Sequence, residues 1–258
     1  MLEVLQIRAL SDNYIYLLHD RETGATAAVD PAEPEPVLAA LRNQGWQLNL
    51  ILNTHHHSDH VGGNLALKRA TGCIVIGSVW DHGQNRIPGI DRGVDEGGRV
   101  EVGRAVARVM SVPGHTLGHI VFQFQSDGVL LCGDTLFGMG CGRLFEGSAT
   151  QMWMSLRKLR CLPPDTRVYC AHEYTEANGR FALTVDPENP ELQARMEQVH
   201  RARMVGQPTV PFTLADELAT NPFLRPESPG LRATLGLPDA DDVDVFAETR
   251  RRKDRFSG

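Results

Sequence analysis

The sequence predicts an α/β protein that begins as a layered sandwich and ends as a helical domain. Short β-rich segments alternate with helical patterns over the first 80 residues, and four further strand signals follow between residues 100 and 171. These later strands cluster, which is more typical of a sandwich than of a doubly wound sheet. Beyond Tyr174 the strand signals fade and helical patterns dominate. We therefore expect an α/β domain over residues 1–173 and a helical domain over 174–258.

The expected strands are short runs rich in β-branched and aromatic residues between turn signals. They cover residues 1–10, 14–20, 25–30, 48–55, 73–78, 100–112, 120–125, 129–132 and 167–171. Helices are expected at 36–43, 61–72 and 152–162, where a glycine or a Pro-Pro pair ends each pattern. Residues 86–98 show neither pattern and are expected to form a loop.

Three more helices are expected in the C-terminal part. Asn189 and Pro190 have the pattern of a helix N-cap followed by proline at the first helical position. Thr213 and Asp216 resemble a capping box before a second, shorter helix. Residues 243–256 are helix-like and strongly basic, which predicts the third.

Composition indicates a soluble protein. The 258 residues are 41% hydrophobic with a formal net charge of −6, which counts against nucleic acid as the main partner. No apolar run approaches the roughly 18 residues of a membrane span, and the N-terminus lacks a signal-peptide pattern. The five cysteines are odd in number and include no C-x-x-C pair, so we expect free thiols and a cytoplasmic location. With no long apolar stripe left over, we expect a monomer.

The residues that carry chemistry begin at NTHHHSDH, residues 53–60, directly after an apolar strand. Alternate residues of an extended segment point to the same side, so His55 and His57 can converge while His56 faces away. Asp59 and His60 follow at the turn into a helix, where they can address a second point nearby. Histidine with carboxylate suits zinc, iron or manganese, and the cluster contains no thiolate of the kind that holds a structural zinc finger.

Three distant segments offer matching ligands. His115 follows a Pro-Gly turn, Asp134 ends one apolar strand, and His172 ends another. Each would be ambiguous alone, because a single histidine at a strand end is more often structural. Together they complete the ligands for two metal ions, with an aspartate whose two oxygens can bridge the pair. His119 is expected to support the site or the core.

The pattern T-H-x-H-x-D-H with downstream G-H-T, G-D-T and A-H-E resembles the metallo-β-lactamase superfamily. Other segments resemble one branch of it, the hydroxyacylglutathione hydrolases or glyoxalases II: CGRLFEG at 141–147, YCAHEYT at 169–175, PTVP at 208–211, NPFLR at 221–225 and RKDRF at 252–256. The resemblance spans the chain and implies an αββα metallo-β-lactamase sandwich followed by a C-terminal α-helical domain. It also implies a first metal ion on His55, His57 and His115, a second on Asp59, His60 and His172, and a bridging Asp134.

By the same resemblance, the reaction is hydrolysis of S-2-hydroxyacylglutathione, chiefly S-D-lactoylglutathione, to glutathione and D-lactate, the second step of methylglyoxal detoxification. A hydroxide bridging two divalent ions, zinc first among them, would attack the thioester, since metal binding lowers the pKa of water from about 16 towards 7. Asp59 and Asp134 are the expected catalytic carboxylates. The thiolate can leave without a general acid because its conjugate acid has a pKa of about 8.5.

The resemblance further implies that glutathione contacts five side chains, namely Arg143, Phe145, Tyr174, Arg250 and Lys253. Cations suit the two carboxylates of glutathione. Phe145 replaces a tyrosine of some members, so one hydroxyl is missing, although the backbone amide can still contribute. A lost hydrogen bond weakens binding by about 1 kcal/mol. The alternative for residues 250–253 is a solvated helix end favoured by the helix dipole, and we expect this of Arg251 and Arg252.

Three other functions stay open at the level of sequence. A mononuclear iron dioxygenase acting on glutathione persulfide resembles this chain but uses fewer protein ligands, so His60 and His172 count against it. An RNA nuclease can use the same metal core, and the acidic balance counts against that function. A metal-storage protein without catalysis is distinguished by a turnover assay with lactoylglutathione.

Overall fold

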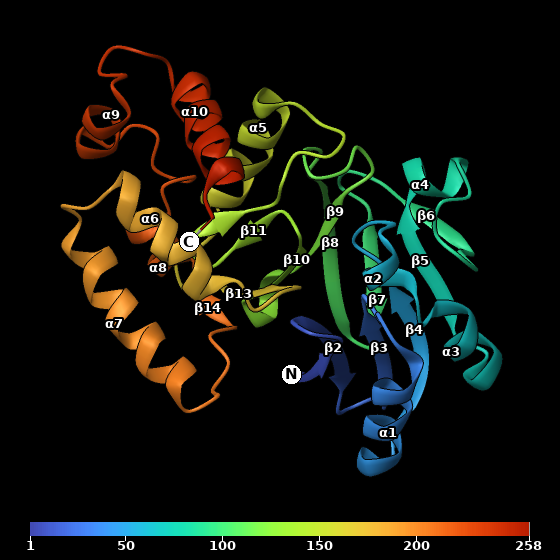
Figure 1. Ribbon diagram of the computed structural model, residues 1–258. Coiled ribbons are helices and arrows are strands. Elements are labelled where there is room, and N and C mark those ends of the chain that lie inside the picture. The colour runs from blue at the N-terminus through green and yellow to red at the C-terminus, as the bar shows by residue number, and fades with distance from the viewer. Residues whose placement is uncertain (258) are drawn as a thin grey trace. The chain divides into compact units, whose positions relative to one another are not determined.

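The computed structural model describes residues 1–257, and the chain forms two compact units (Figure 1). The first unit comprises residues 1–111 and 117–133, and the second comprises 112–116 together with the chain from 134 onward. The chain therefore passes from one unit to the other three times. These units do not test the domain boundary expected between residues 173 and 174, which stays a prediction.

A mixed six-stranded sheet forms one layer of the first unit. Its strands follow the chain order: β1 (Leu2–Ala9), β2 (Asn13–Asp20), β3 (Ala25–Val29), β4 (Gln47–Leu52), β5 (Ile74–Ser78) and β6 (Arg92–Val94). The first three strands pair antiparallel, and β3 to β6 pair parallel. Parallel pairing aligns the carboxyl ends of β3, β4 and β5 along one edge, and the histidine cluster follows β4 at that edge.

Helices α1 (Pro34–Gln44) and α3 (Asn64–Thr71) cover one face of this sheet (Figure 1). Their buried side chains Val37, Leu41 and Leu67 join the apolar core formed by the strands. Each helix ends at a glycine with left-handed backbone, Gly45 and Gly72, which supplies the C-cap conformation at little steric cost. Helices α2 (Ser58–Val61) and α4 (Val79–Gly83) are single turns at the carboxyl ends of β4 and β5.

Four antiparallel strands form the other layer of the first unit. They are β7 (Arg99–Val102), β8 (Ala105–Ser111), β9 (Ile120–Phe124) and β10 (Val129–Gly133), with a 3₁₀ turn at Gln125–Asp127 before β10. Strand β7 lies against β2 and β3 of the first sheet, so the two layers face each other. This is the two-layered, strand-rich arrangement that the clustered strand signals predict.

Two local predictions in this unit were wrong. Residues 100–112 form the hairpin of β7 and β8, and its turn is fixed from a distance, because the Arg104 N–H donates to the Asp20 carboxylate at 2.7 Å. Gly103 at this turn has φ 61°, and a Cβ there would lie 2.3 Å from the same carboxylate. The expected loop 86–98 contains β6, whose three residues are too few to show periodicity.

The second unit is mainly helical. Its strands are β11 (Leu136–Phe137), β12 (Gly140–Cys141), β13 (Arg167–Cys170) and β14 (Phe212–Thr213), and its helices are α5 (Ala149–Arg160), α6 (Thr175–Val185), α7 (Pro190–Met204), α8 (Leu214–Thr220), α9 (Pro229–Leu235) and α10 (Asp242–Arg255). The predicted caps of α7 and α8 are confirmed, since Asn189 and Thr213 each accept a hydrogen bond from a first-turn N–H. Helices α6 and α9 were not predicted.

Stacked and edge-on aromatic rings form the interior of this unit. Phe223 packs against Phe181 and Phe246, and Phe246 packs in turn against Trp153. All four side chains are almost fully buried, so they anchor helices α5, α6 and α10 to one another. Within residues 1–257, no helix is both long and apolar enough to cross a membrane.

Candidate metal centre

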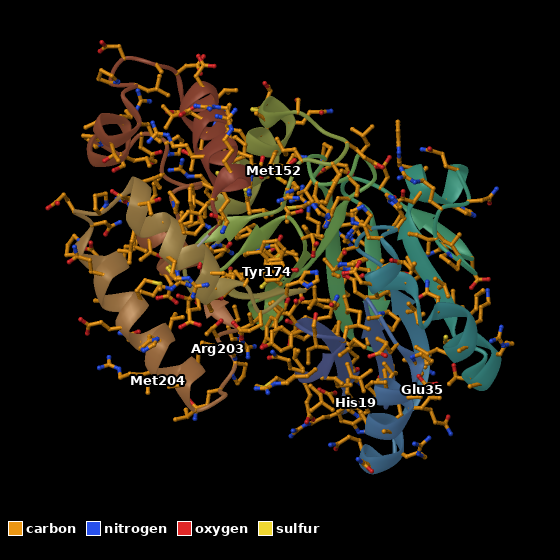
Figure 2. The ribbon with its side chains drawn as sticks, in the orientation of Figure 1. His19, Glu35, Met152, Tyr174, Arg203 and Met204 are labelled. Carbon is orange, nitrogen blue, oxygen red and sulfur yellow. The ribbon has the colours of Figure 1, made fainter. Side chains whose placement is uncertain are left out.

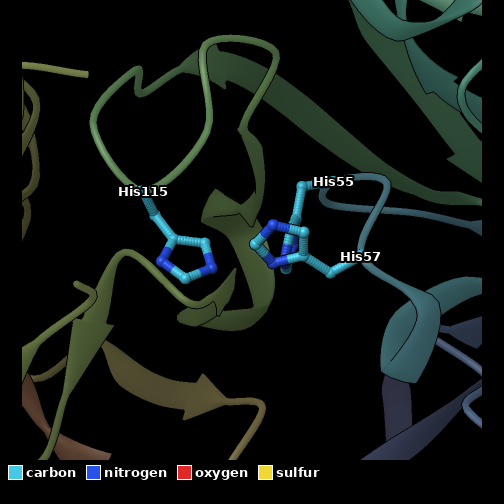
Figure 3. A group of neighbouring side chains, drawn as sticks. All are labelled: His55, His57 and His115. Carbon is cyan, nitrogen blue, oxygen red and sulfur yellow. The ribbon is translucent and has the colours of Figure 1, made fainter. Parts of the chain in front are cut away.

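The loop between β4 and α2 presents His55 and His57 to a common point. Nε2 of His55 lies 3.0 Å from Nδ1 of His57, and the two rings meet edge to face (Figure 3). Two nitrogens on a tetrahedral zinc ion lie about 3.3 Å apart, given Zn–N bonds near 2.05 Å. The convergence that strand alternation predicts is therefore confirmed, at a spacing suited to one shared cation.

His55 and His60 are held through their second ring nitrogen by Asp30 and Thr54. The Thr54 hydroxyl donates to the Asp30 carboxylate at 2.7 Å and lies 3.1 Å from Nδ1 of His55. Asp30 also lies 3.1 Å from Nδ1 of His60. All four side chains are buried. Such partners fix the orientation of both rings, as the partners of metal-binding histidines usually do.

Asp59 stands at the rim of this group, in the first turn of α2. Its carboxylate accepts a hydrogen bond from the Asn13 amide at 3.1 Å and lies 3.4 Å from Nε2 of His60. The side chain is 35% exposed, whereas that of His60 is 1% exposed. Asp59 is therefore the more accessible member of this pair.

The second unit brings His115, Asp134 and His172 together. The two carboxylate oxygens of Asp134 face different imidazoles, with Oδ2 at 3.3 Å from Nε2 of His115 and Oδ1 at 3.4 Å from Nε2 of His172. All three residues are buried. A carboxylate that directs one oxygen towards each histidine has the geometry required to bridge two cations.

A backbone carbonyl holds the ring of His115. Nδ1 of His115 donates to the carbonyl of Arg143 at 2.8 Å, and this contact orients the ring so that Nε2 faces Asp134. The same segment passes close to Asp134, because a Cβ at Gly142 would lie 2.0 Å from the Asp134 carbonyl oxygen. Glycine at 142 is thus required for residues 141–143, the CGR segment, to pass this close to Asp134.

His119 supports the cluster by ring contact. Its imidazole stacks on that of His55, with centroids 4.7 Å apart and planes 18° apart, and it is fully buried. Gly133 passes directly beneath, since a Cβ there would lie 2.9 Å from the His119 ring and 2.3 Å from the Thr54 hydroxyl. Gly133 also has φ 50°, so both space and backbone conformation call for glycine immediately before Asp134.

The donor set in both units fits divalent metal ions. The atoms presented are imidazole nitrogens and carboxylate oxygens, the ligands that suit zinc, iron and manganese. In His55, His60 and His115 the other ring nitrogen already has a protein partner, as metal-binding histidines usually do. The clusters of His and Asp therefore indicate divalent metal binding.

Two of the residues expected at the substrate are exposed aromatic rings beside proposed ligands. Tyr174, which Figure 2 labels, stacks parallel to His172 with ring centroids 4.7 Å apart. Phe145 meets His115 edge to face with centroids 5.2 Å apart. Phe145 is 61% exposed and Tyr174 37%. The Phe145 N–H donates to the His115 carbonyl at 3.3 Å, so this amide is engaged within the protein.

The three expected cations lie in different environments. Arg143 is the exposed one, 3.7 Å from Asp254. Arg250 is buried, donates to the Cys141 carbonyl at 3.0 Å, pairs with Asp254 and lies over the Phe223 ring. Lys253 lies between two phenylalanine rings, and its burial, with Arg250 nearby, lowers its pKa to about 8. The solvated helix end considered for residues 250–253 therefore does not describe Arg250.

Comparison with known proteins matches the whole chain. Residues 14–172 match the model of the metallo-beta-lactamase superfamily, and residues 173–256 match that of the hydroxyacylglutathione hydrolase C-terminus. Hydroxyacylglutathione hydrolases from Methylococcus capsulatus and Rhodospirillum rubrum are 61% and 57% identical, over 100% and 99% of both chains respectively. This chain belongs to the hydroxyacylglutathione hydrolase family.

Solved structures with the same fold are more distant. ETHE1 from Myxococcus xanthus superposes with a TM-score of 0.67 at 24% identity, covering 98% of both chains. TTHA1623, solved in a di-iron-bound form, superposes with a TM-score of 0.62 at 27% identity, covering 86% of this chain and 100% of that one. The fold of this hydroxyacylglutathione hydrolase family member is therefore the metallo-β-lactamase α/β fold with a C-terminal helical domain.

Sequence reasoning missed the residues that hold the side chains of the candidate site. Asp30 ends the strand before the helix α1, and a carboxylate at a strand end was itself a usable signal, as at Asp134. Asn13 and Thr54 carry no such signal, because their roles depend on contacts across the fold. Glu173, next to His172, accepts a hydrogen bond from the N–H of Thr209 at 2.8 Å and lies 3.5 Å from Arg203.

Proposed function

We propose that this protein hydrolyses the thioester of S-2-hydroxyacylglutathione, chiefly S-D-lactoylglutathione, to glutathione and a 2-hydroxy acid, D-lactate. The observation that carries the proposal is the 61% identity to a hydroxyacylglutathione hydrolase over the full length of both chains. That identity includes the C-terminal segment in which the glutathione-specific pattern was recognised. The reaction would be the second step of methylglyoxal detoxification.

The proposed metal ligands are the seven residues expected from the sequence. Figure 3 draws the trio proposed for the first ion, His55, His57 and His115. Asp59, His60 and His172 are proposed for the second ion, and the two-sided geometry of Asp134 supports it as the bridge. We propose two ions, zinc first among them. Iron and manganese suit the same donors, and the similar TTHA1623 was solved with two irons.

When bound, such an ion pair supplies an acidified water and polarises the thioester carbonyl. The protein's own groups orient the reactants around it. Asp59, the accessible carboxylate held by Asn13, is placed to orient the attacking water as well as to bind metal. A thiol has a pKa of about 8.5, so the departing glutathione thiolate needs no general acid from the protein.

The proposed glutathione contacts divide into direct and supporting roles. Arg143 and Lys253 supply positive charge for the carboxylates, and Phe145 and Tyr174 supply apolar ring surface. Arg250 is proposed to act mainly by fixing the Cys141 carbonyl, because its guanidinium is already engaged inside the protein. Its contribution to glutathione binding then comes through the position of the CGR segment.

The decisive experiment combines turnover with elemental analysis of the purified protein. We expect hydrolysis of S-D-lactoylglutathione, followed by loss of the thioester absorbance, together with two equivalents of divalent metal. A protein with full metal content and no thioesterase activity would overturn the proposal. Oxygen consumption with glutathione persulfide tests the dioxygenase alternative, and we expect none above the protein-free rate.

The location and assembly of the enzyme are proposed from its chemistry. All five cysteines are free thiols, four of them buried, which supports the reducing cytoplasm as its compartment. We propose that it acts as a monomer on a small-molecule thioester without nucleic acid or membrane partners. Size-exclusion chromatography with light scattering tests the monomer directly, and a stable mass near twice 28.4 kDa would contradict it.

A further inference from the structure

His56, between His55 and His57 in the loop after β4, directs Nδ1 towards a buried carboxylate. Nδ1 of His56 lies 3.3 Å from Oδ1 of Asp81, while the rings of His55 and His57 meet on the other side of the loop. The His56 ring packs edge to face against both neighbouring imidazoles, with centroids 6.3 and 5.0 Å away. The orientation of His56 is therefore packed against both of the neighbouring rings.

Asp81, in the first turn of α4, has a fully buried carboxylate. Its side chain is 0% exposed, and Oδ2 accepts a hydrogen bond from the Ser78 hydroxyl at 3.0 Å. The Arg86 guanidinium lies 3.8 Å from Oδ1 and also contacts Nε2 of His56. Burying a carboxylate is costly unless charged and polar partners compensate for it, and here the partners are Arg86, His56 and Ser78.

A second loop of the centre closes over the same carboxylate. A Cβ at Gly118 would lie 2.6 Å from Oδ2 of Asp81, so the backbone there rests directly on the carboxylate. The next residue, His119, stacks on His55. Asp81 thus contacts two segments. One carries His55 and His57, and the other carries His119, whose ring stacks on that of His55.

We propose that Asp81 is a positioning residue of the metal centre, which acts through His56 to fix the loop that presents His55 and His57. The inference rests on the proposed function for the identity of the ligands, and it adds a residue outside them. Asp81 touches neither metal nor substrate. Its effect is to restrict the loop to the conformation in which the two imidazole nitrogens lie 3.0 Å apart.

The first test measures zinc affinity by competition with a chromophoric chelator. For Asp81→Asn we expect affinity to fall about ten- to a hundredfold, the usual effect of removing an outer partner of a metal site. The matched control is Asp91→Asn, because Asp91 also belongs to the first unit, accepts a backbone N–H (from Val75 at 2.8 Å) and pairs with a cation, Lys68. Both variants should lose some stability, and only Asp81→Asn should lose zinc affinity beyond twofold.

The second test substitutes the ring through which Asp81 acts. His56→Ala should weaken zinc binding as Asp81→Asn does, whereas His56→Asn should retain most of the affinity because its amide keeps a polar group where Nδ1 lies. The double variant Asp81→Asn/His56→Ala should be no weaker than the worse single variant, since the two residues act in series. If Asp81→Asn fails to fold, the two single variants of His56 test the positioning role by themselves.

Two outcomes would overturn the proposal. One is an Asp81→Asn zinc affinity within twofold of that of Asp91→Asn, which would make Asp81 a purely structural residue of the first turn of α4. The other is a His56→Ala variant with unchanged zinc affinity. Failure of the proposed function is separate: wild-type protein that binds zinc without hydrolysing lactoylglutathione would remove the activity and leave the positioning role intact.

Discussion

Replacing Arg250 with methionine separates a structural role from direct substrate binding. The substitution removes the donor to the buried Cys141 carbonyl and the cation over Phe223. A hydrogen bond from a charged group contributes about 2 kcal/mol and a partly buried cation–π contact about 1 kcal/mol. The ion pair with Asp254 adds little, because the Asp254 side chain is 38% exposed. We therefore expect the free energy of unfolding to fall by about 3 kcal/mol.

The matched control is Arg143→Ala, which removes an exposed cation two residues after Cys141, the residue to which Arg250 donates. Its side chain is 60% exposed and lies 3.7 Å from the Asp254 carboxylate, so stability should change by less than about 0.5 kcal/mol. Its KM for lactoylglutathione should rise with kcat retained, since it binds a remote part of the substrate. Urea unfolding of the metal-saturated proteins and steady-state kinetics give both numbers.

The reasoning fails if Arg250→Met unfolds within about 1 kcal/mol of wild type while its KM rises as much as that of Arg143→Ala. That result would mean that the guanidinium leaves its internal partners to bind glutathione. The structural role of Arg250 is supported if Arg250→Met loses much of its stability and its KM recovers when glycerol or low temperature restores the fold.

Three further predictions follow from the described contacts. Asp134→Ala should lose most of both metal ions, because the carboxylate faces His115 and His172 at once; elemental analysis showing full occupancy would contradict the bridging role. The Lys253 ammonium loses its charge as pH rises through about 8, so KM should rise between pH 7 and 9 in the wild type and less in Lys253→Arg; parallel profiles would contradict this. Hydrogen bonds from the Arg104 N–H and the Thr23 hydroxyl lower the pKa of Asp20 from 3.8 to about 2, so Asp20 stabilises the fold above pH 4 and this contribution is lost as pH falls through 2. Asp20→Asn should therefore be less stable than wild type at pH 7 and equally stable near pH 2 by thermal unfolding, and a constant difference would refute it.

The ligand-bearing segments were predictable because their signals are local. An apolar strand followed by His55 and His57 contains both the extended geometry and the chemistry in eight residues, and the loop has the convergence that alternation predicts. The caps of α7 and α8 are equally local, since Asn189 and Thr213 bond within their own first turns. Such elements need no knowledge of the rest of the fold.

The missed features depend on partners far along the chain. Helix α6 contains Gly179, which a helical pattern disfavours, yet a Cβ there would lie 1.9 Å from the Met196 sulfur of α7. The buried state of Arg250 likewise depends on the Cys141 carbonyl, 109 residues earlier. The contacts of Asp30 with His60 and of Asp81 with His56 join residues that are 30 and 25 positions apart, so they too depend on the tertiary fold.

The chain passes three times between the two units, which limits where the polypeptide can be cut into separate pieces. The five residues 112–116 are grouped with the second unit, although the residues on both sides of them belong to the first. A break at 133/134 would leave His115 on the N-terminal piece and Asp134 at the very start of the other. Neither half would then carry a full proposed ligand set, so gene fusion, domain shuffling or split-reporter designs must keep the polypeptide continuous across this junction.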